Sequence, residues 1–180
     1  SSSKRPREVI DLTGSESSKI YKFDDGSEYK GDLNEDGKPH GKGKMTYASD
    51  LIYEGDWING KRHGNGKMTF ANGVIYEGDF NDNNRNGKGK MTFTNHEVYE
   101  GDFKDGKPNG KGKMTYLSDS VYEGDWRDGK RHGNGKMTFI NGEVYEGDFK
   151  DNKRNGKGKM IFHDGGSYEG DFKDDKRTGK

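Results

Sequence analysis

The chain repeats itself every 23 residues, and this period constrains its fold more than any other feature. Seven tyrosines mark the repeat, and after a first interval of 24 residues each follows the previous one by 23: Tyr29, Tyr53, Tyr76, Tyr99, Tyr122, Tyr145 and Tyr168. The six methionines, from Met45 to Met160, keep the same spacing. A period in this range is typical of repeat proteins, in which each unit packs only against its neighbours.

The repeat reads approximately Y-E-G-D-[WF]-x-[DN]-x-K-x-[HN]-G-x-G-K-M-T-[FY] and ends in a short turn. We divide the chain into a flexible tail, residues 1–19, and an array, residues 20–180. The array holds a half repeat at 20–28, six full repeats at 29–167 and a partial seventh at 168–180. The segment "WINGKRHGNGKMTF" returns 69 residues later as "WRDGKRHGNGKMTF", which indicates that a block of three repeats was duplicated.

Each repeat contains two segments in which side chains alternate between two faces. In the third repeat, Tyr76, Gly78 and Phe80 share one face, and Glu77 and Asp79 share the other. The segment "GKGKMTF" at 87–93 alternates in the same way. The repeat is therefore expected to be two strands, with an aromatic, glycine-rich face and a charged face.

A strand register follows if acidic residues are to meet lysines. Tyr76 then lies opposite Met91 in its own hairpin and opposite Met68 in the preceding one, and Asp79 faces Lys88. A slip of one residue would move every ring to the charged face. The preceding connection, residues 71–73, becomes a three-residue hairpin loop with glycine at the position that needs a positive φ.

Glycine in the middle of a strand is costly, yet this sequence places one there in every repeat. Removing a side chain costs about 0.5–1 kcal/mol of stability, whereas burying an aromatic ring contributes about 1.5–3 kcal/mol. We expect the rings to lie over rows of glycine, because no Cβ obstructs them there.

At these residues the sequence resembles the MORN repeat family (membrane occupation and recognition nexus), through Y-E-G-[DE]-[WF] followed by G-K-x-x-G-x-G. The resemblance covers roughly residues 20–180. It implies an all-β fold, an elongated and twisted single antiparallel sheet of consecutive hairpins that forms a solenoid-like ribbon. It also implies partner binding rather than a reaction, because such arrays occur in very different proteins.

The aromatic face is the first candidate binding surface. Such a face could serve only as core, or it could hold an amphipathic helix, an extended peptide or a second copy of the array. The residues that we expect to line it are Tyr53, Trp57, Tyr76, Phe80, Tyr99, Phe103, Tyr122, Trp126, Tyr145 and Phe149.

Other patterns argue against catalysis and against cofactor or metal sites. His40, His63 and His132 share a repeat position with asparagine and threonine, which favours a turn residue over a metal ligand. The recurring carboxylates of Y-E-G-D indicate a solvated charged face. The G-x-G-K strings lack the spacing of a phosphate-binding loop. There is no cysteine, and the net charge of zero argues against nucleic-acid binding.

The tail carries a second candidate. Residues Val9, Ile10, Asp11, Leu12 and Thr13 resemble a SUMO-interacting motif, in which a short apolar strand adds to the edge of a partner's sheet. The alternative is that this segment docks on the protein's own sheet. The preceding "KRPR", residues 4–7, resembles a minimal nuclear-import signal.

Together these patterns predict a non-enzymatic, intracellular (cytoplasmic or nuclear) scaffold for protein–protein interactions. Two alternatives stay open. The array could be an accessory module of an enzyme of the lipid kinase or lysine methyltransferase type, or it could bind a phospholipid surface, which its zero net charge disfavours.

Overall fold

A computed structural model describes residues 5–9 and 19–179, and every regular element in these residues is a β-strand. No helix in the described part is long and apolar enough to cross a membrane. The chain divides into two compact units, Ser1–Arg85 and Asn86–Lys180, which we describe separately.

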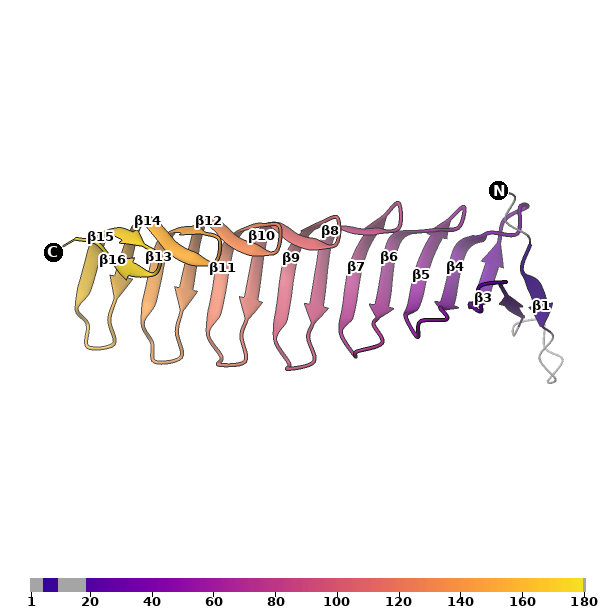
Figure 1. The fold of residues 1–180 in the computed structure, drawn as a ribbon, viewed down its shortest axis with the longest axis horizontal. Coiled ribbons are helices and arrows are strands. Elements are labelled where there is room, and N and C mark those ends of the chain that lie inside the picture. Colours follow the sequence, from indigo (N-terminus) through magenta and orange to yellow (C-terminus); the bar gives the residue numbers. More distant parts are fainter. Residues whose placement is uncertain (1–4, 10–18, 180) are drawn as a thin grey trace. The chain divides into compact units, whose positions relative to one another are not determined.

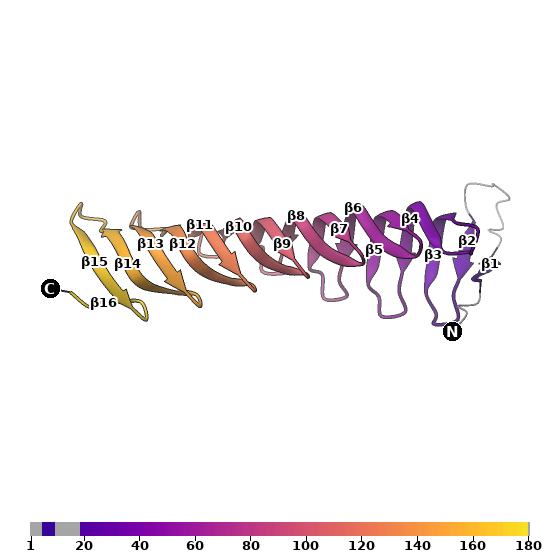
Figure 2. The same ribbon diagram turned by 90° about the horizontal axis from the view of Figure 1, so that it is seen from above.

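The strands follow one another in chain order and pair antiparallel with their sequence neighbours (Figures 1 and 2). The first unit contains β1 (Arg7–Val9), β2 (Ile20–Lys22), β3 (Glu28–Leu33), β4 (Pro39–Thr46), β5 (Ile52–Ile58), β6 (Lys61–Thr69), β7 (Ile75–Asn81) and the first residues of β8 (Asn84–Thr92). The second unit continues β8 and contains β9 (Val98–Lys104), β10 (Lys107–Thr115), β11 (Val121–Arg127), β12 (Lys130–Thr138), β13 (Val144–Lys150), β14 (Lys153–Ile161), β15 (Ser167–Lys173) and β16 (Lys176–Arg177). The predicted all-β fold of consecutive antiparallel hairpins is confirmed.

The predicted register is confirmed where β6 meets β7. Tyr76 lies opposite Met68 and Glu77 lies opposite Lys67. The loop at 71–73 is closed by a hydrogen bond of 2.8 Å from the Phe70 N–H to the Val74 carbonyl, and Gly73 has a φ of 94°. Alternation and turn chemistry therefore agree on one pairing, as the sequence predicts.

Within the hairpins the register changes after the central glycine. In β5–β6, Gly55 faces Gly66, but the next pair is Trp57 with Arg62, so a bulge intervenes. The expectation that the aspartate of each motif faces a residue of the same hairpin is wrong here, because the bulge shifts the second strand. Asp56 instead pairs with Lys42 of the preceding hairpin and forms an ion pair with it.

The core of each unit is a row of tyrosine alternating with tryptophan or phenylalanine. In the first unit, the Trp57 ring packs edge-on against Tyr53 and Tyr29, with centroid distances of 4.9 and 5.7 Å. In the second, Trp126 packs edge-on against both Tyr99 and Tyr122 at 5.1 Å. Such edge-to-face pairs add about 0.5–1.5 kcal/mol each beyond the area that they bury. Each ring thus ties one repeat to the next.

The central glycines allow this packing in two ways. A Cβ on Gly135 would collide with the ring of Tyr122, and a Cβ on Gly124 would collide with the backbone of Gly135 on the facing strand. The expectation that rings lie over a glycine row is confirmed for the glycines of the second strand. The glycine of the first strand has a different role, since it allows the two backbones to approach.

Part of the predicted tail is paired with the array. β1 lies antiparallel to β2, with Val9 opposite Ile20. Val9 is the first residue of the predicted SUMO-interacting motif, and its pairing agrees with the alternative that the segment docks on its own sheet. Residues 10–13 of the motif lie outside the described part of the chain.

Candidate interaction surface

All ten aromatic residues predicted to bind a partner are buried inside their own units. Their exposed fractions lie between 0 and 8% for Tyr53, Trp57, Tyr76, Phe80, Tyr99, Phe103, Tyr122, Trp126, Tyr145 and Phe149. The rings are therefore primarily core, and whether they also contribute to partner binding stays a prediction. A partner would contact the residues that cover them.

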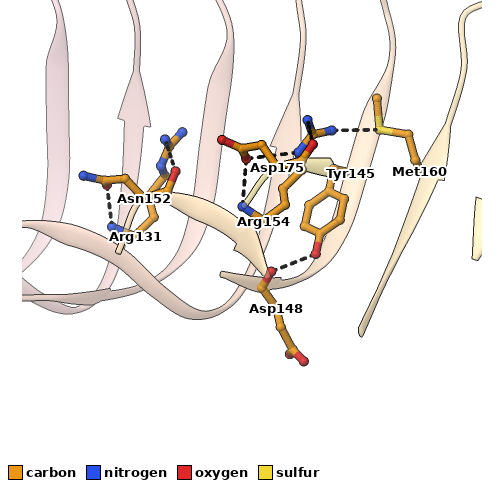
Figure 3. Close-up of polar contacts among 7 residues, drawn as sticks. All are labelled: Arg131, Tyr145, Asp148, Asn152, Arg154, Met160 and Asp175. Atoms are coloured by element: carbon orange, nitrogen blue, oxygen red, sulfur yellow. Dashed lines mark hydrogen bonds and ion pairs between the residues drawn. The ribbon is translucent and has the colours of Figure 1, made fainter. Parts of the chain in front are cut away.

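The polar atoms of these rings are satisfied within the array. The Tyr145 hydroxyl donates to the Asp148 carbonyl at 2.7 Å (Figure 3), and the Trp126 indole N–H donates to the Gly112 carbonyl at 3.0 Å. Burial, followed by the nearby Asp148 charge, raises the pKa of Tyr145 to about 12. Because the hydroxyl stays protonated at neutral pH, this row is not suited to acid–base chemistry.

Arginines cover the buried rings and clamp adjacent hairpins together. Arg131 donates its backbone N–H to the Asn152 side-chain oxygen at 2.9 Å and its guanidinium to the Asn152 carbonyl at 2.7 Å (Figure 3). Arg154 makes the equivalent bonds to Asp175 at 2.9 and 2.8 Å. We call these contacts, and those of Arg62 with Asn83 in the first unit, the arginine clamps.

The clamp arginines also stack on aromatic rings. The Arg131 guanidinium carbon lies 5.6 Å from the centroids of Tyr116 and Phe149. In the first unit, the Arg62 guanidinium carbon lies 5.9 Å from the centroid of Tyr47 and 6.0 Å from that of Tyr53. Contacts of this type contribute about 0.5–2 kcal/mol, more when solvent is excluded. The surface above the core is therefore made of arginine and of the aromatic residue that ends each repeat.

This surface is hollowed in the second unit. An open concavity of about 620 Å³ is lined by Glu97, Tyr116, Leu117, Ser118, Ser120, Arg131, Met137 and Phe139. A second hollow, of about 250 Å³, shares Arg131, Met137 and Phe139 with the first. We call the two together the Tyr116–Phe139 groove.

Two exposed aliphatic residues distinguish this groove from the first unit. Leu117 is 66% exposed and Ile140 is 70% exposed, in the turns that follow Tyr116 and Phe139. In the first copy of the duplicated block, the same positions hold Ala48 and Ala71. A leucine and an isoleucine left in solvent gain little for folding, because most of their apolar surface is not removed from water.

The charges in the groove are unevenly compensated. The Arg154 Nε lies 3.3 Å from an Asp175 carboxylate oxygen, whereas Arg131 forms no ion pair with any residue in the described ranges. The Glu97 carboxylate, at the rim, already accepts the Leu117 N–H at 3.1 Å. Arg131 thus has no carboxylate within ion-pair distance among the described residues, although Glu97 and Asp175 balance the two arginines of the groove in formal charge.

The histidines that the sequence suggested as turn residues, His40, His63 and His132, lie in strands β4, β6 and β12, and His40 makes a structural hydrogen bond. His40 Nδ1 accepts the Asn59 N–H at 3.2 Å, and Asn86 and Asn109 accept the equivalent N–H groups of Asp105 and Asp128 at 2.9 and 3.2 Å. Histidine and asparagine alternate because either accepts this bond. Among the described residues, no three His, Asp or Glu side chains gather where a metal ion could bind.

The aspartates of the repeat do more than the solvated role expected from sequence. The Asp102 carboxylate accepts the Lys111 N–H at 2.9 Å beside the bulge and forms an ion pair with Lys88. The hydrogen bond from Lys88, followed by that from the Lys111 backbone, lowers the pKa of Asp102. The sequence signal for this role, which the analysis of alternation missed, is the first glycine of the G-x-G pair in the facing strand β10. This residue, Gly110, has a φ of 108° at the bulge.

A comparison with solved structures finds domains with a similar fold. The TCP domain of SAS-4 (dCPAP) from Drosophila melanogaster, solved in complex with a proline-rich motif of Ana2 (dSTIL), has a TM-score of 0.57 and 17% identity, covering 92% of this chain and 88% of that one. The TCP10 domain of CPAP from Danio rerio has a TM-score of 0.47 and 9% identity, covering 93% and 84%. At this identity the first likeness shows the fold alone.

The comparison with protein families is more specific. A search of curated proteins finds no match. The family model of the MORN repeat matches seven consecutive segments: 29–51, 53–75, 76–98, 99–120, 122–144, 145–167 and 168–180. These are the six full repeats and the partial seventh that the period predicts. The chain belongs to the MORN repeat family.

Proposed function

We propose that this chain is a non-enzymatic scaffold that binds an extended segment of a partner protein in the Tyr116–Phe139 groove. One observation carries the proposal: the groove is open, and it is flanked by aliphatic residues, Leu117 and Ile140, that are more than half exposed. In this proposal the ten buried rings do not contact the partner directly. They form the core that supports the residues of the groove.

The chemistry of the groove favours a peptide that contains proline and one acidic residue. Proline-rich segments adopt an extended helix before binding, so they lose little entropy, and they dock in grooves lined by aromatic side chains. Tyr116 and Phe139 supply such a lining. Arg131 has no carboxylate partner among the described residues, and an acidic residue of the peptide would provide one. The proline-rich ligand of the SAS-4 domain supports this choice.

The test is a selection followed by a titration. Peptides are selected on the whole chain from a displayed random library, and the most enriched peptide is synthesised. Its affinity is then measured for wild type and for the Leu117→Ala/Ile140→Ala variant. Both alanines occur at the equivalent positions of the first block, so the fold accommodates them. We expect a loss of at least about tenfold in affinity, or about 1.4 kcal/mol.

The matched control is Ile161→Ala, which removes an exposed aliphatic side chain that is 41% exposed and lies outside the groove. It should leave the affinity unchanged. Equal affinity of wild type and the double variant would show that the partner binds elsewhere. Enrichment of no peptide, together with a dimer in light scattering, would favour self-association over a peptide partner.

SUMO binding through residues 9–13 remains a separate proposal. Val9 is already paired with Ile20, so SUMO would have to replace β2 as the partner of this strand or pair with its other edge. Titration of SUMO into wild type and into Ile10→Ala/Leu12→Ala tests it. The absence of any shift with wild type would remove this function.

A further inference from the structure

The short loops at one edge of the second unit are flanked by pairs of basic residues. Each loop joins the two strands of a hairpin, and the last residue of the first strand lies opposite the first residue of the second. All eight of these positions hold a lysine or an arginine. We call these exposed residues the basic ridge: Lys104, Lys107, Arg127, Lys130, Lys150, Lys153, Lys173 and Lys176.

This arrangement is unfavourable for the sheet itself. Like charges that lie directly opposite each other on neighbouring strands are destabilising. The corresponding positions of the first unit hold at most one cation beside each loop: Asn34 with Lys38, Ile58 with Lys61, and Asn81 with Asn84. The fold therefore does not require two cations at these positions.

The positive charge of the ridge is not neutralised within the hairpins. No ridge residue forms an ion pair with another described residue, whereas Lys61 in the first unit lies 2.6 Å from the Asp82 carboxylate of the next hairpin. The four loops also contain five aspartates, so their cations exceed their acids by three. One of these aspartates, Asp175, is already engaged by Arg154 at 3.3 Å.

The pairs of the ridge recur at a regular interval. Because consecutive strands are antiparallel, the loops after β9, β11, β13 and β15 all leave the sheet at the same edge. Neighbouring strands lie about 4.8 Å apart, which places successive loops about 10 Å apart. A chain in the polyproline II conformation rises about 3.1 Å per residue with three residues per turn, so every third side chain shares one face at intervals of about 9 Å. The two intervals nearly match.

We propose that the basic ridge binds an extended acidic segment of a partner protein in which a carboxylate recurs at every third residue. Each carboxylate meets one pair of cations, so that an opposite charge bridges two groups that repel each other in the free protein. Single contacts of this kind are weak because they are exposed, and binding therefore needs several of them at once and weakens with salt. The ridge shares no residue with the Tyr116–Phe139 groove.

A protein segment fits the ridge better than an anionic membrane surface does. An aspartate follows the first cation of every pair, and a continuous layer of negative charge would repel it. A narrow chain can place its carboxylates at the cations and its neutral residues beside the aspartates. The loops also hold no apolar side chain that could enter a lipid interface.

The test uses a synthetic peptide in which the sequence Glu-Ser-Ser is repeated four times, titrated into the whole chain at low ionic strength. This spaced peptide contains neither proline nor an apolar residue, so it lacks the features proposed for the groove ligand. A second peptide has the same composition with its four glutamates adjacent. We expect NMR amide shifts at the four ridge loops, and tighter binding of the spaced peptide because only this peptide reaches all four loops.

The ridge variant is Lys104→Asn/Arg127→Asn/Lys150→Asn. Uncharged residues already occupy these positions in the first unit, so the fold accommodates them. The Tm should not fall, because the change removes repulsion between like charges. We expect the affinity for the spaced peptide to fall at least about tenfold, since three of the four pairs lose a cation.

The matched control is Lys90→Asn/Lys113→Asn/Lys136→Asn. It removes the same charge from the same unit, at strand centres where each lysine faces a glutamate. This variant should keep most of the affinity. Equal losses in the two variants would show that only net charge matters and would overturn the site.

The remaining outcomes separate the ridge from other surfaces. Absence of binding by wild type, or shifts only outside the ridge, would overturn the proposal, and equal affinity for the two peptides would overturn the match in spacing. A loss in Leu117→Ala/Ile140→Ala but not in the ridge variant would assign the peptide to the groove. Vesicles of phosphatidylcholine with phosphatidylserine form the last arm. Vesicle binding that the ridge variant loses, without binding of the spaced peptide, would assign the ridge to a membrane instead of a protein.

Discussion

At the scale of single residues, the fold depends on the contact between a tyrosine ring and a glycine on the facing strand. Tyr122 is completely buried, and its ring occupies the space that a side chain at Gly135 would fill. The glycine that looks unfavourable for a strand is thus required by the ring. The same contact recurs between Tyr145 and Gly158.

Gly135→Ala should destabilise the chain by about 1–3 kcal/mol, the usual range for overpacking a filled core. The added methyl group must displace the Tyr122 ring. Chemical denaturation followed by circular dichroism measures the effect. Gly166→Ala is the control, since the equivalent positions hold Ser120 and Glu143, and it should change stability by less than about 0.5 kcal/mol. Equal effects of the two changes would contradict the role of the ring.

Asp102 should make stability depend on pH. Its pKa lies below the usual value of about 4 because Lys88 and the Lys111 N–H favour the carboxylate. The stabilisation is present above the unfolded pKa and is lost as the pH falls through the folded value. The stability difference between wild type and Asp102→Asn should therefore shrink between about pH 5 and pH 2, as denaturation at matched ionic strength would show. A gap that widened in acid would refute the assignment.

At the scale of the hairpin, the arginine clamps explain a pairing of residue types between adjacent repeats. Arg131 is followed 21 residues later by Asn152, which accepts its N–H. Pro108 has no N–H to satisfy, and the residue 21 positions on is Gly129, whose own N–H donates to the Pro108 carbonyl at 2.9 Å. Pro39 and Gly60 repeat this arrangement at 2.8 Å.

Asn152→Gly should cost about 0.5–2 kcal/mol, because it removes the acceptor of the Arg131 N–H while keeping a residue that tolerates the φ of 72°. The double variant Arg131→Pro/Asn152→Gly recreates the natural Pro–Gly pair. The double variant should lose less unfolding free energy than the sum of the losses of the two single variants, as a double-mutant cycle measures. Additive losses would show that the two positions are uncoupled.

Much of the hairpin could be predicted from the sequence. The pairing of Tyr76 with Met68 follows from alternation, since only one register buries the rings. The bulge at Gly64, with a φ of 69°, was missed because both glycines of G-x-G were assigned to one face. The groove was missed because alternation places Tyr122 and Phe149 on a face without indicating that Arg131 covers them. That information depends on contacts between repeats.

At the scale of the whole molecule, each unit has its own natural probe. Trp57 lies in the first unit and Trp126 in the second, and each is buried. Stability in repeat proteins is approximately a sum of repeat and neighbour contributions, so the two units need not lose structure together.

Two single-tryptophan variants should separate the unfolding of the units. Trp57→Phe leaves Trp126 as the only tryptophan, and Trp126→Phe leaves Trp57; phenylalanine occupies this position in other repeats, for example Phe80. When Gly135→Ala is added, the denaturation midpoint reported by Trp126 fluorescence should fall further than that reported by Trp57. Identical falls would indicate a single cooperative unit.

The clamps have a further consequence for how such a chain can lengthen. Within each copied block, the two residues that meet at a junction between repeats match, either arginine with asparagine or aspartate, or proline with glycine. Where the two copies of the block adjoin in the sequence, Arg85 is followed 21 residues later by Gly106, which is a mixed pair. An insertion of one repeat at another place would create further mixed pairs, proline with asparagine or arginine with glycine. When a whole block of three repeats is duplicated, both residues of each junction inside the block are copied together. The 69-residue offset thus records the duplication of a whole block, a gene rearrangement that keeps the paired residues of each internal junction together.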